Sequence, residues 1–177
     1  MKALYEVFPN ILVQFEDFSS EHVSFILIHP VITSSYWLVY CFIQAFGLLE
    51  KYQDKVFCFN DDIQGTGSVI LAGFMNAVRL AKENAGVDPK DHRIVFFGAG
   101  SSAIGVAKQI LSYFMREHGL SEEEAKKIFY LVDSKGLVTL DRGDRLAQHK
   151  VYFARSDNSQ AQFRTLCDVI DYVKPTA

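Results

Sequence analysis

Residues 93–105 read RIVFFGAGSSAIG, and this stretch decides the fold. Its first part, RIVFF, is rich in β-branched and aromatic side chains and predicts a buried strand. The glycines of GAG permit a tight turn, after which apolar residues recur at helical spacing as far as Phe114. Gly119 is a suitable helix stop. A buried strand that passes through a glycine turn into a helix predicts one step of a βα repeat.

The sequence on either side continues this alternation. Further strands are predicted at residues 11–15 (ILVQF), 55–59 (KVFCF) and 128–132 (IFYLV). Further helices are predicted from Gly67 to Gly86, from the Ser121–Glu124 capping box, and over residues 163–173 before Pro175, with mostly loop over residues 143–158.

These elements predict an α/β protein: a Rossmann-like, doubly wound parallel sheet, incomplete at both ends. We expect residues 1–67 to belong to a metal- and substrate-binding region and residues 68–177 to form a dinucleotide-binding domain that is truncated at its C-terminus.

Bulk properties exclude several functional classes. The chain has 177 residues, a formal charge of -3 and a pI near 5.9, so nucleic acid and anionic membranes are not expected partners. Its three cysteines form no CxxC pair, which argues against a disulfide framework or a zinc site and for a reducing compartment. The first residues lack the pattern of a signal or transit peptide. We expect a cytoplasmic or mitochondrial protein, with the cytoplasm favoured.

The glycine turn has the pattern of a dinucleotide fingerprint. Gly98, Gly100 and Ala103 occupy the three small positions of GxGxxG/A between a strand and a helix, and Ser101 and Gly105 flank the last of them. Such glycines let the backbone approach a pyrophosphate, whose charge is stabilised by free amides at the helix N-terminus. The alternative is an ordinary strand-to-helix turn.

The next strand ends at Asp133, where an acidic side chain can accept hydrogen bonds from the adenosine ribose hydroxyls and so favour NAD. A basic cluster follows and could instead neutralise the ribose 2'-phosphate of NADP. Its members are Lys135, Arg142, Arg145 and Lys150, each of which taken alone could simply lie in a solvated loop.

Acidic pairs follow two other predicted strands: Glu16 with Asp17, and Asp61 with Asp62. Open α/β sheets place their ligand sites at the carboxyl ends of strands. Carboxylates gathered there repel unless a cation compensates, and ligands that are all oxygen suit Mg²⁺ or Mn²⁺. Helix caps or solvated turns are the alternative.

Four segments in order resemble the malic enzymes: QFEDF at 14–18, CFNDDIQGTGSVILAG at 58–73, FFGAGSSAIG at 96–105 and LVDSKGL at 131–137. The resemblance implies an oxidoreductase that oxidises L-malate with NAD(P)⁺ and decarboxylates it to pyruvate and CO₂, with Mg²⁺ or Mn²⁺ holding the substrate. It also implies a parent enzyme that is a homo-oligomer.

The resemblance extends to single residues. It implies Glu16, Asp17 and Asp62 as metal ligands, with Asp61 supporting them. It implies a cofactor site formed by Gly98, Gly100, Ser101, Ala103, Gly105 and Asp133. Ser134, Lys135 and Lys150 are similar to the NADP-preferring branch, which outweighs the case that Asp133 makes for NAD.

Some functional residues of the family have no counterpart in this sequence. The tyrosine acid, the lysine base and a malate-binding arginine would precede residue 1, and asparagines near malate and nicotinamide would follow residue 177. We therefore expect negligible turnover from these residues alone. A noncatalytic dinucleotide-binding or regulatory module of the same family is the alternative.

Residues 23–44, VSFILIHPVITSSYWLVYCFIQ, contain no Asp, Glu, Lys or Arg and interrupt the resemblance. Without them, His22 joins Ala45 and the sequence continues as in the family. The first two residues of the segment, Val-Ser, and its last residue, Gln, can be encoded by codons that match intron boundaries. Our hypothesis is a retained in-frame intron of 66 nucleotides, which sequencing of the spliced transcript would test. The rival is a transmembrane helix, which would separate the metal ligands.

Overall fold

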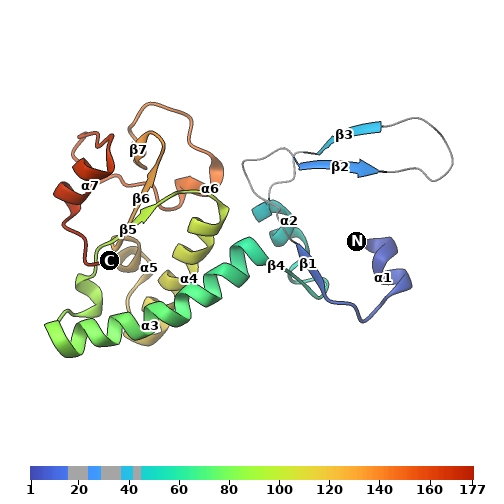
Figure 1. Cartoon of the computed structure of the whole chain (residues 1–177), viewed down its shortest axis with the longest axis horizontal. Helices are drawn as coiled ribbons and strands as arrows, with labels where there is room; N and C mark the ends of the chain where they lie inside the picture. The colour runs from blue at the N-terminus through green and yellow to red at the C-terminus, as the bar shows by residue number, and fades with distance from the viewer. Residues whose placement is uncertain (16–23, 29–36, 42–44) are drawn as a thin grey trace. The chain divides into compact units, whose positions relative to one another are not determined.

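A computed structural model of the chain describes residues 1–15, 24–28, 37–41 and 45–177, and of residues 24–28 and 37–41 it describes the backbone only. The chain forms two compact units, Met1–Asp62 and Ile63–Ala177 (Figure 1). The sequence predicted a boundary after residue 67, a short distance further along the chain.

The first unit contains two short helices and two pairs of strands: α1 (Lys2–Val7), β1 (Val13–Phe15), β2 (Ser24–Ile28), β3 (Trp37–Cys41), α2 (Ala45–Tyr52) and β4 (Cys58–Asn60). β1 and β4 are parallel, and Phe15 lies opposite Asn60. β4 begins later than predicted because the carbonyl of Tyr52, at the end of α2, accepts hydrogen bonds from the amides of Lys55 and Val56.

The described parts of the apolar segment at residues 23–44 are strands. β2 and β3 pair in antiparallel register from Ser24 opposite Cys41 to Ile28 opposite Trp37. Among all the residues that the structure describes, no helix is both long and apolar enough to cross a membrane. Residues 24–28 and 37–41 are thus strands, where the transmembrane alternative expected a helix. The retained-intron hypothesis stays a hypothesis.

The second unit is the α/β part of the chain. Its elements are η1 (Asp61–Gly65, which begins in the first unit), α3 (Thr66–Ala85), η2 (Pro89–Asp91), β5 (Ile94–Phe97), α4 (Ser101–His118), α5 (Glu122–Lys126), β6 (Phe129–Asp133), β7 (Gly136–Leu137), α6 (Gln148–Val151) and α7 (Leu166–Val173). The predicted glycine stops at Gly86 and Gly119 are confirmed, since both adopt left-handed conformations. The predicted Ser121–Glu124 capping box is also confirmed.

The sheet of the second unit has the order β5-β6-β7. β5 and β6 are parallel, as predicted, but β7 turns back antiparallel to β6, which the sequence analysis did not foresee. On the other edge of β5, the amide of Ala177 donates to the carbonyl of Arg93 and its own carbonyl accepts from Val95. This is the bonding pattern of a parallel ladder, so the chain returns to the opposite edge of β5 and creates a topological switch point.

Helices cover both faces of this sheet (Figure 1). On one face, Val169 and Val173 of α7 pack against Val132 and Leu137 in a cluster of buried residues. Phe129 and Leu131 alternate with Val132 along β6 and so project to the other face, the side of α4. The predicted core face of α4 is confirmed by its six fully or almost fully buried residues, Ile104, Val106, Ala107, Ile110, Leu111 and Phe114. The doubly wound α/β fold is therefore confirmed.

α3 forms where its apolar periodicity predicted it, but its apolar side chains are mostly not buried. Val69 is 74% exposed and Leu80 is 47% exposed, whereas Val78 is buried. α3 packs along α4, and Gly67 allows a close approach to the side chain of Gln109 there. Some apolar side chains of α3, such as Val78, are thus buried in the second unit. Others, such as Val69 and Leu80, are exposed in the structure as described.

Candidate cofactor site

The glycine loop connects β5 to α4 at the switch point. Gly98 has a φ of 144°, a conformation that residues with a Cβ rarely adopt. Its amide donates to the carbonyl of Val132 on β6, at 2.8 Å. The loop is therefore fixed against the neighbouring strand, and α4 begins at Ser101 directly after the turn.

Gly100 needs a different explanation, because its φ of -82° is open to any residue. A Cβ built on Gly100 would meet no atom of the described residues within 4 Å. Neither backbone conformation nor packing within the chain therefore requires glycine at this position. In a dinucleotide fingerprint, glycine at this position lets the backbone approach the pyrophosphate, and this is the role that the sequence predicts for Gly100.

The N-terminus of α4 is also suited to an anion. Its N-cap residue is Gly100, which makes no side-chain cap, whereas α5 and α7 are both closed by capping boxes, at Ser121 and Thr165. Uncapped amides at a helix N-terminus and the positive end of the helix dipole together attract phosphate. The N-terminus of α3 also has no side-chain cap, but α3 continues directly from η1, whereas α4 begins at the glycine loop.

Ala103, the last small position of the fingerprint, and Gly105, two residues further on, differ in their surroundings. Ala103 is partly exposed on the first turn of α4. Gly105 lies against Ile63, whose carbonyl oxygen would be only 2.5 Å from a Cβ at this position. Gly105 therefore positions α4 through close packing, and its contacts are with the protein itself.

Asp133 lies at the end of β6, with its side chain 10% exposed. Its two carboxylate oxygens accept four hydrogen bonds: two from Arg142 at 2.9 and 2.8 Å, one from the amide of Lys135 at 2.9 Å and one from Lys150 at 3.3 Å. Burial alone would raise the pKa of Asp133, but these hydrogen bonds and the charge of Arg142 outweigh it and lower the pKa to about 2. Asp133 is thus an anion at every physiological pH.

A second carboxylate joins this cluster. Asp144 accepts a hydrogen bond from Nε of Arg142 at 2.6 Å and one from Nζ of Lys135 at 2.8 Å. Hydrogen bonds from Lys135 and then Arg142 lower the pKa of Asp144. Three of the four predicted basic residues, Lys135, Arg142 and Lys150, therefore share two carboxylates, while Arg145 is exposed. We call these five paired side chains the ribose-end cluster.

The turn between β6 and β7 places this cluster beside the glycine loop. Asp133 pairs with Gly136, so Ser134 and Lys135 form the two-residue turn, and Gly136 closes it with a φ of 105°. β5 and β6 are adjacent, with Phe97 opposite Val132. The glycine loop and the ribose-end cluster consequently follow neighbouring parallel strands at the same edge of the sheet, where open α/β sheets bind ligands.

The predicted metal ligands are only partly described. Asp61 and Asp62 directly follow β4 and form the first turn of the π-helical segment η1. Glu16 and Asp17 lie outside the described residues, although they directly follow β1, whose last residue is opposite the last residue of β4. Within the described part of the chain, no three His, Cys, Asp or Glu side chains gather as metal ligands. The donor types, all carboxylates, fit Mg²⁺ or Mn²⁺.

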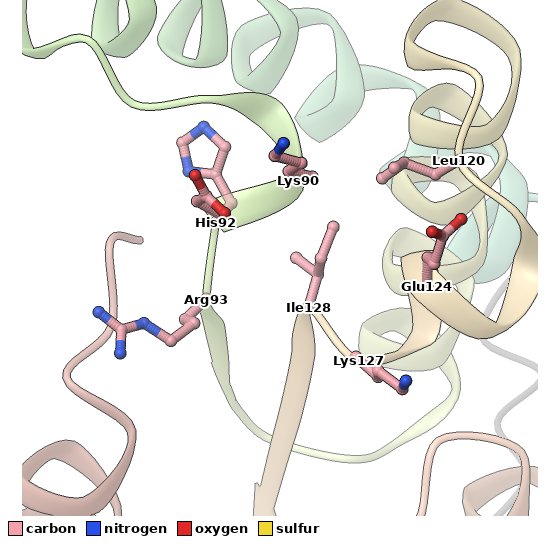
Figure 2. Close-up of a pocket in the computed structure, with 8 residues that line it drawn as sticks. Lys90, His92, Arg93, Leu120, Glu124, Lys127 and Ile128 are labelled. Carbon is pink, nitrogen blue, oxygen red and sulfur yellow. The ribbon is translucent and has the colours of Figure 1, made fainter.

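A cavity of about 570 Å³ lies at the opposite, amino end of the strands (Figure 2). Arg93 and Ile128, which directly precede β5 and β6, are among its lining residues. In Figure 2 the side chains of Arg93 and Lys127 point away from one another, so these two cations do not converge on a common ligand position. This cavity is distinct from the edge at which the cofactor motifs gather.

Comparison with known proteins agrees with this geometry. The family described as "Malic enzyme, NAD binding domain" matches residues 63–177. The chain belongs to this family. The match begins at the first residue of the second compact unit and includes the glycine loop and the ribose-end cluster.

Individual malic enzymes show the same relationship. The chain is 46% identical over 177 residues to the NADP-dependent malic enzyme of Dictyostelium discoideum and 36% identical over 178 residues to NAD-dependent malic enzyme 3 of Bacillus subtilis. These matches cover 100% and 97% of the chain but only 27% of each relative. The chain thus spans about a quarter of their length.

A solved structure shows the same fold. The crystal structure of an NAD-dependent malic enzyme from Thermotoga maritima superposes with a TM-score of 0.52 and 21% identity. The superposition covers 87% of this chain and 32% of that one. At this level of identity the likeness concerns the fold alone.

Sequence reasoning missed Asp144, and it separated Asp133 from the basic residues as if they favoured different cofactors. The available signal was the run Arg142-Gly-Asp144-Arg145, in which acid and base alternate. Such a run indicates that ion pairs form, but it does not identify the partners. The partners of Arg142 depend on the β6–β7 turn.

Proposed function

We propose that the chain is the dinucleotide-binding part, with part of the metal site, of an NAD(P)-dependent malic enzyme that converts L-malate to pyruvate and CO₂. The observation that carries this proposal is the glycine loop, which is open and uncapped at the switch point of a unit that matches the malic enzyme family. The activity of the whole enzyme is inferred from that family relationship.

Within this function we propose a preference for NADP. All four acceptor positions of the Asp133 carboxylate are in use, so it has no spare lone pair for the ribose hydroxyls of NAD. Its charge is also matched by Arg142 and Lys150, which removes the repulsion that it would otherwise exert on a 2'-phosphate. The relative with 46% identity is named as NADP-dependent.

Each group of residues has its own task in this proposal. Amides of the first turn of α4 bind the pyrophosphate, and Lys135, with Ser134 beside it on the turn, faces the ribose phosphate. Glu16, Asp17 and Asp62 would hold Mg²⁺ or Mn²⁺, with Asp61 beside them. The metal would supply Lewis-acid polarisation of the substrate oxygens, and the nicotinamide would accept the hydride.

The Gly100→Ser variant tests the cofactor site. Serine is a good N-cap, so its hydroxyl should accept a hydrogen bond from an amide of α4 and stabilise the fold by roughly a few tenths of a kcal/mol. The same hydroxyl occupies the pyrophosphate position, so NADP affinity should fall at least about tenfold. Isothermal titration calorimetry with NADP and thermal denaturation measure the two effects, whose opposite signs separate lost binding from misfolding.

Gly73→Ala in the middle of α3 is the matched control, because its Cβ would also meet no atom within 4 Å. It should stabilise the helix by up to about 1 kcal/mol and leave NADP affinity unchanged. An unchanged affinity in Gly100→Ser would refute the glycine loop as the pyrophosphate site.

Turnover requires a separate test. We expect residues 1–177 alone to bind NADP without reducing it when malate and Mn²⁺ are added. A form completed at both ends with the sequence of the Dictyostelium relative should produce NADPH, and Asp62→Asn in that form should abolish Mn²⁺-dependent turnover. If the completed form binds NADP but never reduces it, the noncatalytic alternative is correct.

A further inference from the structure

The outermost ion pair of the ribose-end cluster is between Lys135 and Asp144. The side chain of Lys135 is 63% exposed and that of Asp144 is 23% exposed, whereas Arg142 is only 7% exposed. An incoming ligand therefore meets this pair first. Lys135 lies on the β6–β7 turn beside the glycine loop, at the edge where the adenosine ribose is expected.

Asp144 holds two cations in the way a phosphate would. One of its oxygens accepts from Nε of Arg142 and the other accepts from Nζ of Lys135. A ribose 2'-phosphate also binds through oxygens that accept from arginine and lysine. The carboxylate of Asp144 and the phosphate of NADP consequently compete for the same kind of donor, and Lys135 is the exposed donor.

The net charge of the ribose-end cluster determines how strongly it attracts a 2'-phosphate. Three cations and two carboxylates give a formal charge of +1 before any ligand binds. A 2'-phosphate dianion would thus enter a cluster that is already largely neutralised. Without the carboxylate of Asp144 the formal charge would be +2, and Lys135 would lose the one ion-pair partner that it has among the described residues.

Arg142 would keep its position in that case. Both of its Nη atoms donate to Asp133, a bidentate pair that does not involve Asp144. Lys150 also pairs with Asp133 and not with Asp144. The cluster is therefore built on Asp133, and Asp144 is an additional anion at its exposed side.

We propose that Asp144 is a specificity-determining residue that competes with the 2'-phosphate of the cofactor for Lys135 and Arg142, and so weakens the discrimination between NADP and NAD. This inference rests on the proposed NADP site. Loss of the carboxylate strengthens binding of 2'-phosphorylated adenosine nucleotides and leaves the unphosphorylated ones unaffected.

The test compares two probes that differ only in the 2'-phosphate: adenosine 2',5'-bisphosphate and adenosine 5'-monophosphate. Asp144→Asn should bind the bisphosphate about three- to tenfold more tightly at low salt, with a change of less than about twofold for the monophosphate. Raising the salt concentration should reduce the gain. Calorimetry on residues 1–177 and their variants measures both dissociation constants.

Two control variants separate competition from general effects. Asp171→Asn removes the same charge from an exposed position on α7, where the side chain is 82% exposed, and should leave both affinities unchanged. Asp144→Glu keeps the charge and should retain the wild-type ratio of affinities. The gain from Asp144→Asn should also shrink in a Lys135→Gln background, because the contested donor is then absent.

The outcomes distinguish this inference from the proposed NADP preference. If the wild-type chain binds both probes equally, the NADP preference is wrong, and a gain in Asp144→Asn still supports competition. If the wild-type chain prefers the bisphosphate and Asp144→Asn leaves the ratio unchanged, competition alone is wrong. Equal weakening of both probes in Asp144→Asn and Asp144→Glu would show that Asp144 only supports the fold, which also overturns the proposal.

Discussion

The two ends of the proposed cofactor site use different groups of the chain, backbone at one end and charged side chains at the other. The pyrophosphate end is backbone: a glycine with φ 144°, a second glycine with open space beside it, and the N-terminus of α4, which has no side-chain cap. The ribose end is made of side chains, in which Arg142 links Asp133 to Asp144. One end depends on conformation, and the other depends on the pairing of charges.

This difference determines what each end can change. A backbone site recognises a group that every dinucleotide carries, and only a change of glycine or of the helix start alters it. A side-chain cluster recognises the group that differs between NAD and NADP, and a single substitution can shift its charge. The family contains both NAD- and NADP-dependent relatives, as this division of tasks would allow.

The largest effect is expected from Arg142→Leu, which tests whether ion pairing holds the ribose end together. The guanidinium is 7% exposed, and its loss would leave Asp133 and Asp144 without their shared partner. Breaking such a pair on one side should cost about 3 kcal/mol of unfolding free energy, measured by urea denaturation. The double variant Asp133→Asn/Arg142→Leu should recover part of the loss. A cost below about 0.5 kcal/mol would mean that the cluster is not structural.

A smaller effect is expected at the pyrophosphate end from Gly98→Ala. Alanine at a φ of 144° is strained, although its Cβ would meet no atom within 4 Å. The strain should cost about 1 to 3 kcal/mol, again measured by urea denaturation. Ser134→Ala, in the exposed β6–β7 turn, is the comparison and should change stability by less than about 0.5 kcal/mol. Equal effects would show that the conformation of Gly98 is not what fixes the loop.

The sequence was sufficient for features that depend on local pattern. The strand before Gly98, the helix after it and the glycine stop at Gly119 follow from periodicity and backbone conformation. The predicted start of β4 was wrong because the carbonyl of Tyr52, at the end of α2, accepts hydrogen bonds from two amides of the predicted strand. That hydrogen bonding depends on how one helix ends, which the strand pattern does not contain.

The site was predictable to a lesser degree. The members Asp133, Lys135 and Lys150 were identified from their positions after a strand and from the resemblance. Their pairing was not, because it depends on the antiparallel return of β7, a two-residue strand too short to give a periodic signal. Asp144 was missed for the same reason: only the folded turn brings it to Lys135.

The smallest effect is expected from pH, which tests the ion pairs without changing a residue. The pKa of Asp133 is about 2 in the folded chain and 3.8 ordinarily, so the folded state favours the charged form. The stabilisation is complete above about pH 4 and is lost as the pH falls towards 2.

The comparison of the wild-type chain with Asp133→Asn isolates this contribution. The difference in unfolding free energy between them should shrink across that window, by about 1 kcal/mol once solvent screening is allowed for. Protonation costs less than Arg142→Leu because Arg142 keeps its pair with Asp144. A difference that stays constant from pH 5 to pH 2 would mean that Asp133 is stabilised by packing and not by charge.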